Sequence, residues 1–160
     1  VMGKMQFDRI DDSILRALQN NARISNKELA AAVGLAPSSC LERVRRLQSK
    51  GIITGYGARV EPAALGVGLQ AFVSVRLTSH SRDLVETFRT HLTTLPEVLS
   101  LYHMGGEYDF LVHVAVRDAN HLRDLALDAF TTRSEVARIQ TALVYEHLQP
   151  GVWPNYALTE

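Results

Sequence analysis

The apolar residues of this chain change their spacing partway along the sequence. Up to about residue 50 they recur every three or four positions, which is typical of amphipathic helices. From about residue 69, stretches with a period of two alternate with helical stretches, which is typical of strands joined by helices. A length of 160 residues suits one domain or two small ones. The change of period favours two, a helical one followed by one built from strands and helices.

Three helices are predicted in the first segment. For the first helix, Asp11 or Asp12 is the candidate N-cap. Ser25 and Glu28 have the spacing of a capping box at the start of the second helix, and Gly34 has the position of a glycine that ends it. The third helix is followed by a short strand with a turn, expected at residues 52–56. The apolar stripes that mark the three helices are Ile10, Ile14, Leu15 and Leu18; Leu29, Ala30 and Val33; and Leu41, Val44 and Leu47.

The short connection between the second and third helices is typical of a helix-turn-helix. Gly34 supplies its turn and Leu35 a buried apolar anchor, and the third helix is then the candidate DNA reader. Arginines beside small polar residues can neutralise phosphates or pair with guanine. The alternative is an ordinary three-helix bundle with a solvated basic face. The residues that the apolar stripe directs to other faces of this helix are Ser38, Ser39, Glu42, Arg43, Arg45 and Arg46.

The formal net charge of +0 hides an uneven distribution. Residues 1–60 carry a net charge of +5 and residues 61–160 a net charge of −5. Such asymmetry indicates that one part of a chain meets a polyanion, although a split of this size among so few charges also arises by chance.

The second half has the element order β-α-β-β-α-β, a split βαβ pattern of the ferredoxin-like type. The fold class is therefore α+β, and a sheet with helices on one face needs a cover for the other, for which a second copy is the simplest candidate. The expected division is a helix-turn-helix domain over residues 1–56, a linker strand or hinge over 57–68, the βαββαβ domain over 69–148 and a tail over 149–160. Trp153 and Tyr156 in the tail either pack on a neighbouring subunit or stay mobile.

Several other classes are disfavoured by the sequence. No apolar run approaches the ~18 residues of a membrane span, no signal peptide is visible, and a single cysteine fits a reducing compartment, so a cytoplasmic protein is expected. The six histidines have no familiar metal-binding spacing, and no nucleophile elbow, P-loop or dinucleotide motif is present. We therefore expect no metal and no catalytic residues.

Several spaced motifs resemble the leucine-responsive regulatory protein / AsnC family of bacterial and archaeal transcription factors. In the first half they are Phe7-Asp8-Arg9-Ile10-Asp11, Arg23-Ile24-Ser25-Asn26, Val33-Gly34-Leu35, and Cys40 to Leu47 followed by Gly51-Ile52-Ile53 and Gly55-Tyr56. In the second half, Gly106-Glu107-Tyr108-Asp109-Phe110 resembles the glycine–acid–aromatic–aspartate turn of the family's effector domain. The resemblance covers residues 7 to 148.

The resemblance implies a winged helix-turn-helix joined by a linker strand to a βαββαβ regulatory domain. It also implies homodimers that assemble further, into an octamer, with an amino acid bound at the contacts between dimers. The chain departs from the family at Ala36, where a capping serine is usual, at Glu135, and at Ile139, where a threonine is usual. Ser38 or Ser39 is expected to take over the cap. The predicted DNA-binding residues are Ser25, Asn26, Lys27, Pro37, Ser38, Ser39, Glu42, Arg43, Arg45, Arg46 and Lys50.

The effector site is expected at the turn that contains Gly105 and Gly106. Without a Cβ, backbone N–H groups can approach a carboxylate closely, and Asp109, or alternatively Glu107, can accept an ammonium group. The alternative is a plain hairpin turn in which Asp109 pairs across strands. The full set of predicted effector-binding residues is Tyr102, His103, Met104, Gly105, Gly106, Glu107, Tyr108, Asp109 and Thr141.

The predicted function is that of a sequence-specific transcriptional regulator that binds double-stranded DNA, responds to a free amino acid, needs no other cofactor, and controls genes of amino-acid metabolism or transport. The first alternative is an enzyme on a ferredoxin-like fold that uses His103, Glu107 or Asp109 as acid–base groups. The second is a small-molecule-binding oligomeric module that does not bind DNA. The retained Arg43, Arg45 and Arg46 disfavour the second, and the basic first segment disfavours both.

Overall fold

A computed structural model describes residues 8–158 of the chain and divides it into two compact units. One unit, here called the helical unit, contains the residues up to 59 together with those from 149 on, and the other, the regulatory unit, is Val60–Leu148. Each unit has a separate hydrophobic core, and no helix within residues 8–158 is long and apolar enough to cross a membrane.

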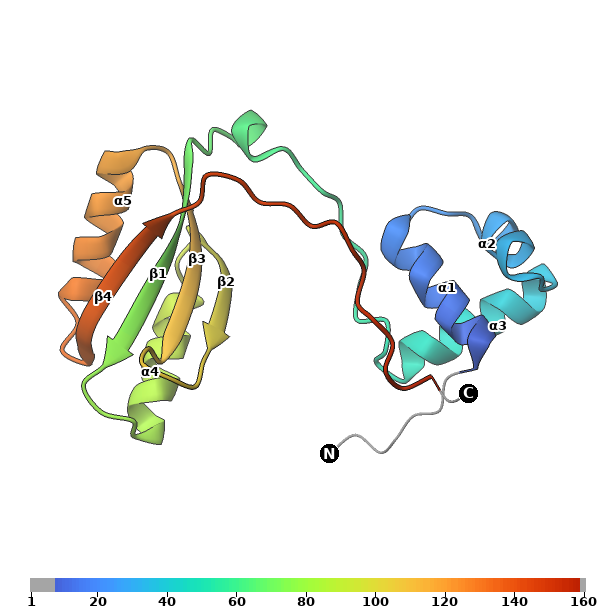
Figure 1. Cartoon of the computed structure of the whole chain (residues 1–160), viewed down its shortest axis with the longest axis horizontal. Coiled ribbons are helices and arrows are strands. Elements are labelled where there is room, and N and C mark those ends of the chain that lie inside the picture. The colour runs from blue at the N-terminus through green and yellow to red at the C-terminus, as the bar shows by residue number, and fades with distance from the viewer. Residues whose placement is uncertain (1–7, 159–160) are drawn as a thin grey trace. The chain divides into compact units, whose positions relative to one another are not determined.

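The helical unit contains α1 (Arg9–Asn20), α2 (Asn26–Val33) and α3 (Pro37–Ser49), which are shown in Figure 1. These helices confirm the predicted helix-turn-helix, with Gly34 in the left-handed conformation (φ 70°) that ends α2. Ile14, Leu29, Ala30 and Leu47 of the predicted stripes are buried. The stripe of the third helix was wrong at Leu41, which is 37% exposed, because Cys40, four residues before Val44, occupies the core position at the start of α3.

The helix caps differ in part from the expectation. Ser25 and Glu28 form the predicted capping box. Asp8, rather than Asp11 or Asp12, caps α1 by accepting a hydrogen bond from the backbone N–H of Asp11 at 2.7 Å. An N-cap residue must itself be extended, as Asp8 is, whereas Asp11 and Asp12 already lie within the helix.

Helix α3 begins without a side-chain cap. Ala36 occupies the N-cap position in an extended conformation (φ −66°, ψ 145°), and neither Ser38 nor Ser39 replaces it, because both lie inside the first helical turn. We expect Ala36→Ser to raise the free energy of unfolding of the helical unit by about 1 kcal/mol, since a serine there can accept a hydrogen bond from the N–H groups of the first turn. Urea denaturation followed by circular dichroism measures the gain. Ser38→Ala is the control and should change little; a loss of stability in that variant would contradict the assignment.

The strand expected at residues 52–56 is not formed. The backbone N–H groups of Ile52 and Ile53 both donate to the carbonyl of Leu47, at 2.9 and 3.3 Å, and the two isoleucines pack on the helical core. No partner strand lies beside this segment among the described residues, and a strand is stable only when paired. The linker likewise contains a 3-10 turn, Pro62–Leu65, instead of a strand.

The tail lies against α1 in the helical unit. The backbone N–H of Trp153 donates to Oε1 of Gln19, and Nδ2 of Asn155 donates to Oδ1 of Asp12, both at 2.9 Å. These contacts hold the tail to its own chain through the backbone of Trp153 and the side chain of Asn155. Trp153 and Tyr156 are 84% and 93% exposed, so their packing on a neighbouring subunit stays a prediction.

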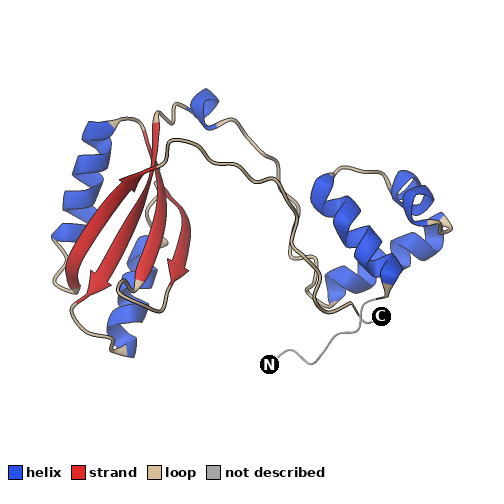
Figure 2. Cartoon of the chain, in the orientation of Figure 1, coloured by secondary structure: helices blue, strands red, loops and turns tan. Residues whose placement is uncertain are grey.

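The regulatory unit confirms the predicted βαββαβ order. Its elements are β1 (Leu69–Leu77), α4 (Arg82–Leu92), β2 (Val98–His103), β3 (Phe110–Val116), α5 (Ala119–Leu125) with a π-helical continuation (Ala126–Thr131), and β4 (Val136–Leu143). The sheet order is β2-β3-β1-β4 and all pairs are antiparallel (Figure 2).

Both helices of the regulatory unit pack on the same face of the sheet. Phe88 of α4 and Phe130 after α5 are buried against Phe110 of β3, with ring centroids of Phe88 and Phe110 5.5 Å apart. Val73 and Val112 contribute to this core from the sheet. The alternate residues of the strands, such as Phe72 and Leu111, lie on the opposite face, which no helix of the unit covers.

Candidate functional site

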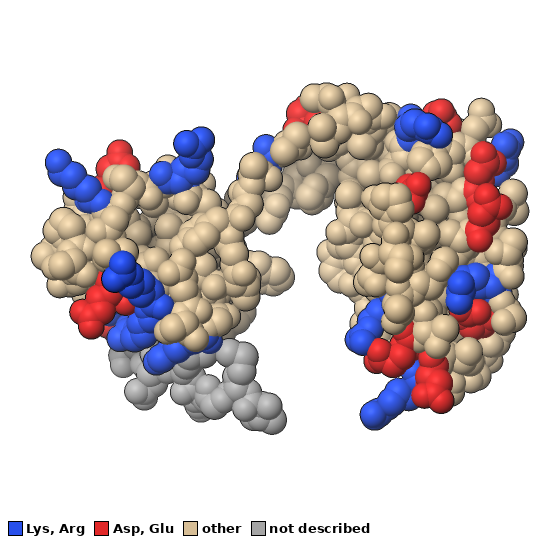
Figure 3. All heavy atoms as spheres, turned by 180° about the vertical axis from the view of Figure 1, so that it is seen from behind, with Lys and Arg blue, Asp and Glu red and all other residues tan. Residues whose placement is uncertain are grey.

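Charged side chains are distributed differently over the two units. Figure 3 shows mainly basic side chains on the helical unit, whereas basic and acidic ones are interspersed over the regulatory unit. The candidate nucleic-acid interface therefore lies in the helical unit, and its residues fall into two groups.

The first group uses its polar atoms inside the helical unit. The hydroxyl of Ser25 donates to Glu28 at 2.7 Å within the capping box. Nδ2 of Asn26 donates to the carbonyl of Pro37 at 2.7 Å, which ties the first turn of α2 to the first turn of α3. These contacts set the geometry of the helix-turn-helix, and the polar atoms concerned are already occupied.

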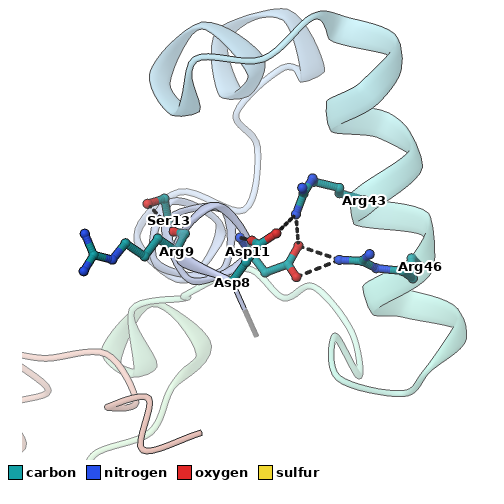
Figure 4. Close-up of polar contacts among 6 residues, drawn as sticks. All are labelled: Asp8, Arg9, Asp11, Ser13, Arg43 and Arg46. Carbon is teal, nitrogen blue, oxygen red and sulfur yellow. Dashed lines mark hydrogen bonds and ion pairs between the residues drawn. The ribbon is translucent and has the colours of Figure 1, made fainter. Parts of the chain in front are cut away.

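Arg43 and Arg46 belong to the same group. Figure 4 shows both guanidinium groups reaching from α3 to the start of α1. Nη1 of Arg43 lies 2.5 Å from Asp8 and 2.9 Å from Asp11, and Nη2 of Arg46 lies 2.8 and 2.6 Å from the two carboxylate oxygens of Asp11. The side chain of Asp11 is only 4% exposed. We call these four residues the Asp–Arg clasp.

The second group is exposed, and its side chains make no hydrogen bond or ion pair with the part of the chain that the structure describes. It includes Arg45, which points away from the buried Cys40 and Leu47, and it is the group that is free to meet a ligand. Its members are Lys27, Ser38, Ser39, Glu42, Arg45 and Lys50. The ring of Pro37 is exposed beside them.

The two aspartates of the clasp were missed as functional candidates. The signal that would have found them is a matched spacing, because Asp11 follows the N-cap residue Asp8 by three positions and Arg46 follows Arg43 by three. Nothing in the local sequence indicated that the two pairs meet.

Three acidic groups of the helical unit, Asp8, Asp12 and Glu28, have a lowered pKa in the folded state and make its stability depend on pH; for Glu28 the cause is its hydrogen bonds with Ser25. The backbone N–H of Asp11, followed by Arg43, holds the pKa of Asp8 below its ordinary value of 3.8, and Asn155, followed by Arg16, does the same for the pKa of Asp12. A carboxylate with a lowered pKa in the folded state stabilises the fold above its unfolded pKa and stops doing so as the pH falls through the folded value.

We therefore expect the free energy of unfolding of the helical unit to be highest above about pH 5 and to fall progressively as the pH goes below 4. Asp12→Asn should make this fall shallower, because an amide in this position does not titrate. Urea denaturation at a series of pH values tests both statements. A helical unit equally stable at pH 3 and pH 7 would contradict them.

The candidate ligand site of the regulatory unit is the connection between β2 and β3. The N–H of Met104 donates to the carbonyl of Asp109 at 2.8 Å and closes the turn, and Gly106 has a φ of 133°, which side chains rarely adopt. Among the described residues, the N–H groups of residues 105–108 have no hydrogen-bond partner. Four consecutive free N–H groups on an exposed turn are suited to an anion.

The contacts of Asp109 match the alternative expected from the sequence, in which it pairs with a neighbouring strand. Asp109 is 5% exposed, and its carboxylate accepts a hydrogen bond from the N–H of Leu77 at 2.7 Å while its other oxygen lies 2.7 Å from Nδ1 of His80. Both oxygens are thus used to hold the segment that follows β1 against the turn. Glu107 is exposed on the turn, so of the two predicted ammonium acceptors it is the accessible one. No local sequence signal pointed to Leu77 or His80.

The remaining predicted effector residues are not all brought to the turn. The ring of His103 stacks on Phe110 at 4.9 Å, and the hydroxyl of Tyr108 donates to Gln140 of β4 at 2.8 Å. Tyr102 and Met104 are exposed beside the turn. Thr141 lies opposite Val73 on β4, and β1 separates β4 from β3, so its strand is about 10 Å from the strand that carries the turn.

Comparison with known proteins covers both units. Residues 7–54 match a family model described as a winged helix-turn-helix DNA-binding domain, and residues 70–154 match the Lrp/AsnC ligand binding domain. The chain is 46% identical over 143 residues to the HTH-type transcriptional regulator AldR of Mycolicibacterium smegmatis, covering 89% of this chain and 84% of the relative. It is 38% identical to the leucine-responsive regulatory protein of Escherichia coli K12, covering 89% and 87%.

A solved structure is also similar. The transcriptional regulator of Neisseria meningitidis in complex with L-methionine superposes with a TM-score of 0.84 at 34% identity, covering 89% of this chain and 92% of the other. Both matched models describe binding domains, and the relatives are named as transcriptional regulators, which leaves the enzyme hypothesis without support.

Proposed function

Because the chain belongs to the Lrp/AsnC family of DNA-binding transcriptional regulators, we propose that it binds operator DNA with the exposed face of α3 and an α-amino acid at the turn of residues 104–109. The observation that carries the second part is the row of free N–H groups at residues 105–108 beside an exposed carboxylate. Genes of amino-acid metabolism or transport are the proposed targets.

The turn suits the two charged groups that every free amino acid carries. Its N–H groups can bind the α-carboxylate, and the side chain of Glu107 can pair with the α-ammonium group. Asp109 supports this site indirectly, because its carboxylate holds residues 77–80 next to the turn. The L-methionine bound to the Neisseria regulator supports the ligand class. Tyr102 and Met104 are the proposed contacts for the ligand's side chain.

A second copy of the chain is the proposed cover of the open sheet face. Phe72 and Leu111 are half-buried there and Tyr102 is 52% exposed, so this face presents apolar side chains that a partner can bury. We propose that such dimers associate further, to an octamer, and that the amino acid binds where dimers meet. The ligand then acts by binding one arrangement of neighbouring dimers better than another.

The DNA-binding part is tested by selecting duplexes from a random library with the wild-type chain and measuring the affinity for the selected duplex at several salt concentrations. Affinity should fall steeply with salt, because each phosphate that the protein neutralises releases counterions. Binding that is absent, or that does not change with salt, would refute the proposal for this unit.

The ligand part is tested by thermal shift with each of the twenty amino acids, repeated with the selected duplex present. We expect one or a few of them to raise the melting temperature and to change DNA affinity or oligomer size. The matched controls are the amide of the active amino acid, which lacks the carboxylate, and its decarboxylated amine. Equal activity of these analogues would refute binding of the carboxylate at the turn.

A further inference from the structure

We infer that the Asp–Arg clasp positions the recognition helix and that Arg45, rather than Arg43 or Arg46, supplies the cationic contact of α3 with DNA. The inference rests on the proposed function, because it assumes that α3 meets the duplex. It divides three arginines that are nearly adjacent in the sequence into two kinds with different tasks.

The clasp uses the charge of its arginines within the protein. Two guanidinium groups face two carboxylates, and all four contacts, to Asp8 and to both oxygens of Asp11, lie between 2.5 and 2.9 Å. The hydrogen bonds to Asp8 and Asp11 raise the pKa of Arg43, so this site favours the charged guanidinium group. Since the clasp is neutral as a whole, it adds little to the attraction of phosphates.

The clasp also connects the two helices whose relative angle decides what α3 can reach. Asp11 is buried at the start of α1, and Arg43 and Arg46 are one helical turn apart on α3. Nη2 of Arg46 contacts both oxygens of Asp11, and Nη1 of Arg43 contacts both aspartates, so these charge-assisted contacts hold the start of α1 close to α3. Small changes in the orientation of a recognition helix move the side chains that contact base edges, so the clasp acts on DNA specificity through the position of the helix.

Arg45 lies on a different side of α3. Ser38, Glu42 and Arg45 have the spacing i, i+4, i+7, which places them in one row along a helix, and all three are exposed. The row lies opposite the buried Cys40 and Leu47. Arg45 is the arginine of α3 that has no ion-pair partner within residues 8–158, so its charge is available to a phosphate or a guanine.

The two alternative roles of Arg46 predict opposite changes in DNA affinity for the substitution Asp11→Asn. If Arg46 contacts DNA, Asp11 competes with the phosphate, and Asp11→Asn tightens DNA binding and makes it more salt-dependent. If Arg46 positions α3, Asp11→Asn weakens binding to the selected duplex and leaves the salt dependence unchanged. Asp11→Glu keeps a carboxylate at the site and should restore part of the affinity.

The experiment uses the full chain and the duplex selected by the wild type, with a scrambled duplex as reference. Affinities are measured by fluorescence anisotropy from about 50 to 200 mM salt, a range over which phosphate contacts produce a large change, and melting temperatures are measured in parallel. The variants are Arg45→Ala, Arg46→Ala, Asp11→Asn and Asp11→Glu, together with the double variant Asp11→Asn/Arg46→Ala.

The salt slope is the steepness with which the logarithm of the affinity falls with the logarithm of the salt concentration. We expect Arg45→Ala to weaken DNA binding about 10-fold or more, to lower the salt slope by about 0.9, and to leave the melting temperature unchanged. Arg46→Ala and Asp11→Asn should each lower the melting temperature and the preference for the selected over the scrambled duplex. The salt slope of both variants should equal that of the wild type. The double variant should lose no more affinity or melting temperature than Arg46→Ala alone. If the Asp11 variants fail to fold, the slopes of Arg45→Ala and Arg46→Ala still decide the assignment.

A lower slope for Arg46→Ala, tighter binding by Asp11→Asn, or a full slope for Arg45→Ala overturns the inference while leaving DNA binding intact. Failure of the wild type to enrich any duplex overturns the proposed function itself, which is a different result.

Discussion

Replacing Asp109 by alanine is expected to abolish the response to the amino acid and to lower the free energy of unfolding of the regulatory unit by about 1–3 kcal/mol. The carboxylate is buried and accepts the N–H of Leu77 at 2.7 Å. Its removal leaves that buried N–H without a hydrogen-bond acceptor, and an unsatisfied buried donor lowers the free energy of unfolding by about this amount. The segment around His80 is released as well, so the turn that carries Glu107 and the free N–H groups loses its support.

The variant Asp109→Asn separates the effect on stability from the effect on ligand binding. The amide oxygen of asparagine can still accept the N–H of Leu77, so most of the stability should return. It carries no charge to attract His80, so the position of the segment after β1, and with it ligand affinity, should recover only in part. Urea denaturation gives the stability, and the ligand-induced thermal shift gives the response. A full response in Asp109→Ala would show that the turn is not the ligand site.

Replacing Phe88 by alanine is expected to have the largest effect on stability, a loss of about 3–5 kcal/mol. The ring is fully buried and lies 5.5 Å from the ring of Phe110 and 6.3 Å from that of Phe130, so its removal leaves a cavity between a helix and the sheet. Neighbouring side chains that belong to rigid elements can close such a cavity only in part.

The loss should be confined to the regulatory unit, because the core of the helical unit shares no residue with that of Phe88. We expect two transitions in urea, of which Phe88→Ala moves only the one that belongs to the regulatory unit. Phe72→Ala is the matched control on the opposite face of the sheet, where the ring is half-buried and stacks on His113 at 4.7 Å. Phe72→Ala should lower the free energy of unfolding less than Phe88→Ala does, and should weaken self-association more. Equal losses for the two variants would contradict this description of the core.

The fold could be predicted to a large extent because burial follows local spacing. The stripes of α1 and α2, the positions of Val44 and Leu47 on α3, and the alternation of β1 and β3 appear in the structure as buried faces. The capping box at Ser25 and the ending of α2 at Gly34 are also local, since all partners lie within a few residues. The strand predicted at residues 52–56 was wrong because a strand requires a partner strand, which local spacing does not reveal. Ile52 and Ile53 instead form a turn that closes α3 and pack on the helical core.

The candidate sites could be predicted in place but only partly in the roles of their residues. The sequence by itself determined that arginines follow one another on the third helix and that an acidic, glycine-containing turn follows the second strand. It did not determine which arginine is free, because Arg43 and Arg46 take partners 32 to 35 residues away. The same holds for Asp109, whose partner Leu77 is 32 residues away.

Only the tertiary structure decided these pairings. A side chain's charge and its position on a helix limit the partners it can accept, but the packing of elements selects one of them by bringing it within about 3 Å. That selection pairs Arg43 and Arg46 with carboxylates of the first helix, joins Asp109 to Leu77 and His80, and separates Thr141 from the turn by a strand. The DNA- and ligand-binding roles of these residues stay predictions. Local periodicity therefore determined the elements of this protein, and the packing between elements decided which polar groups remain free to bind.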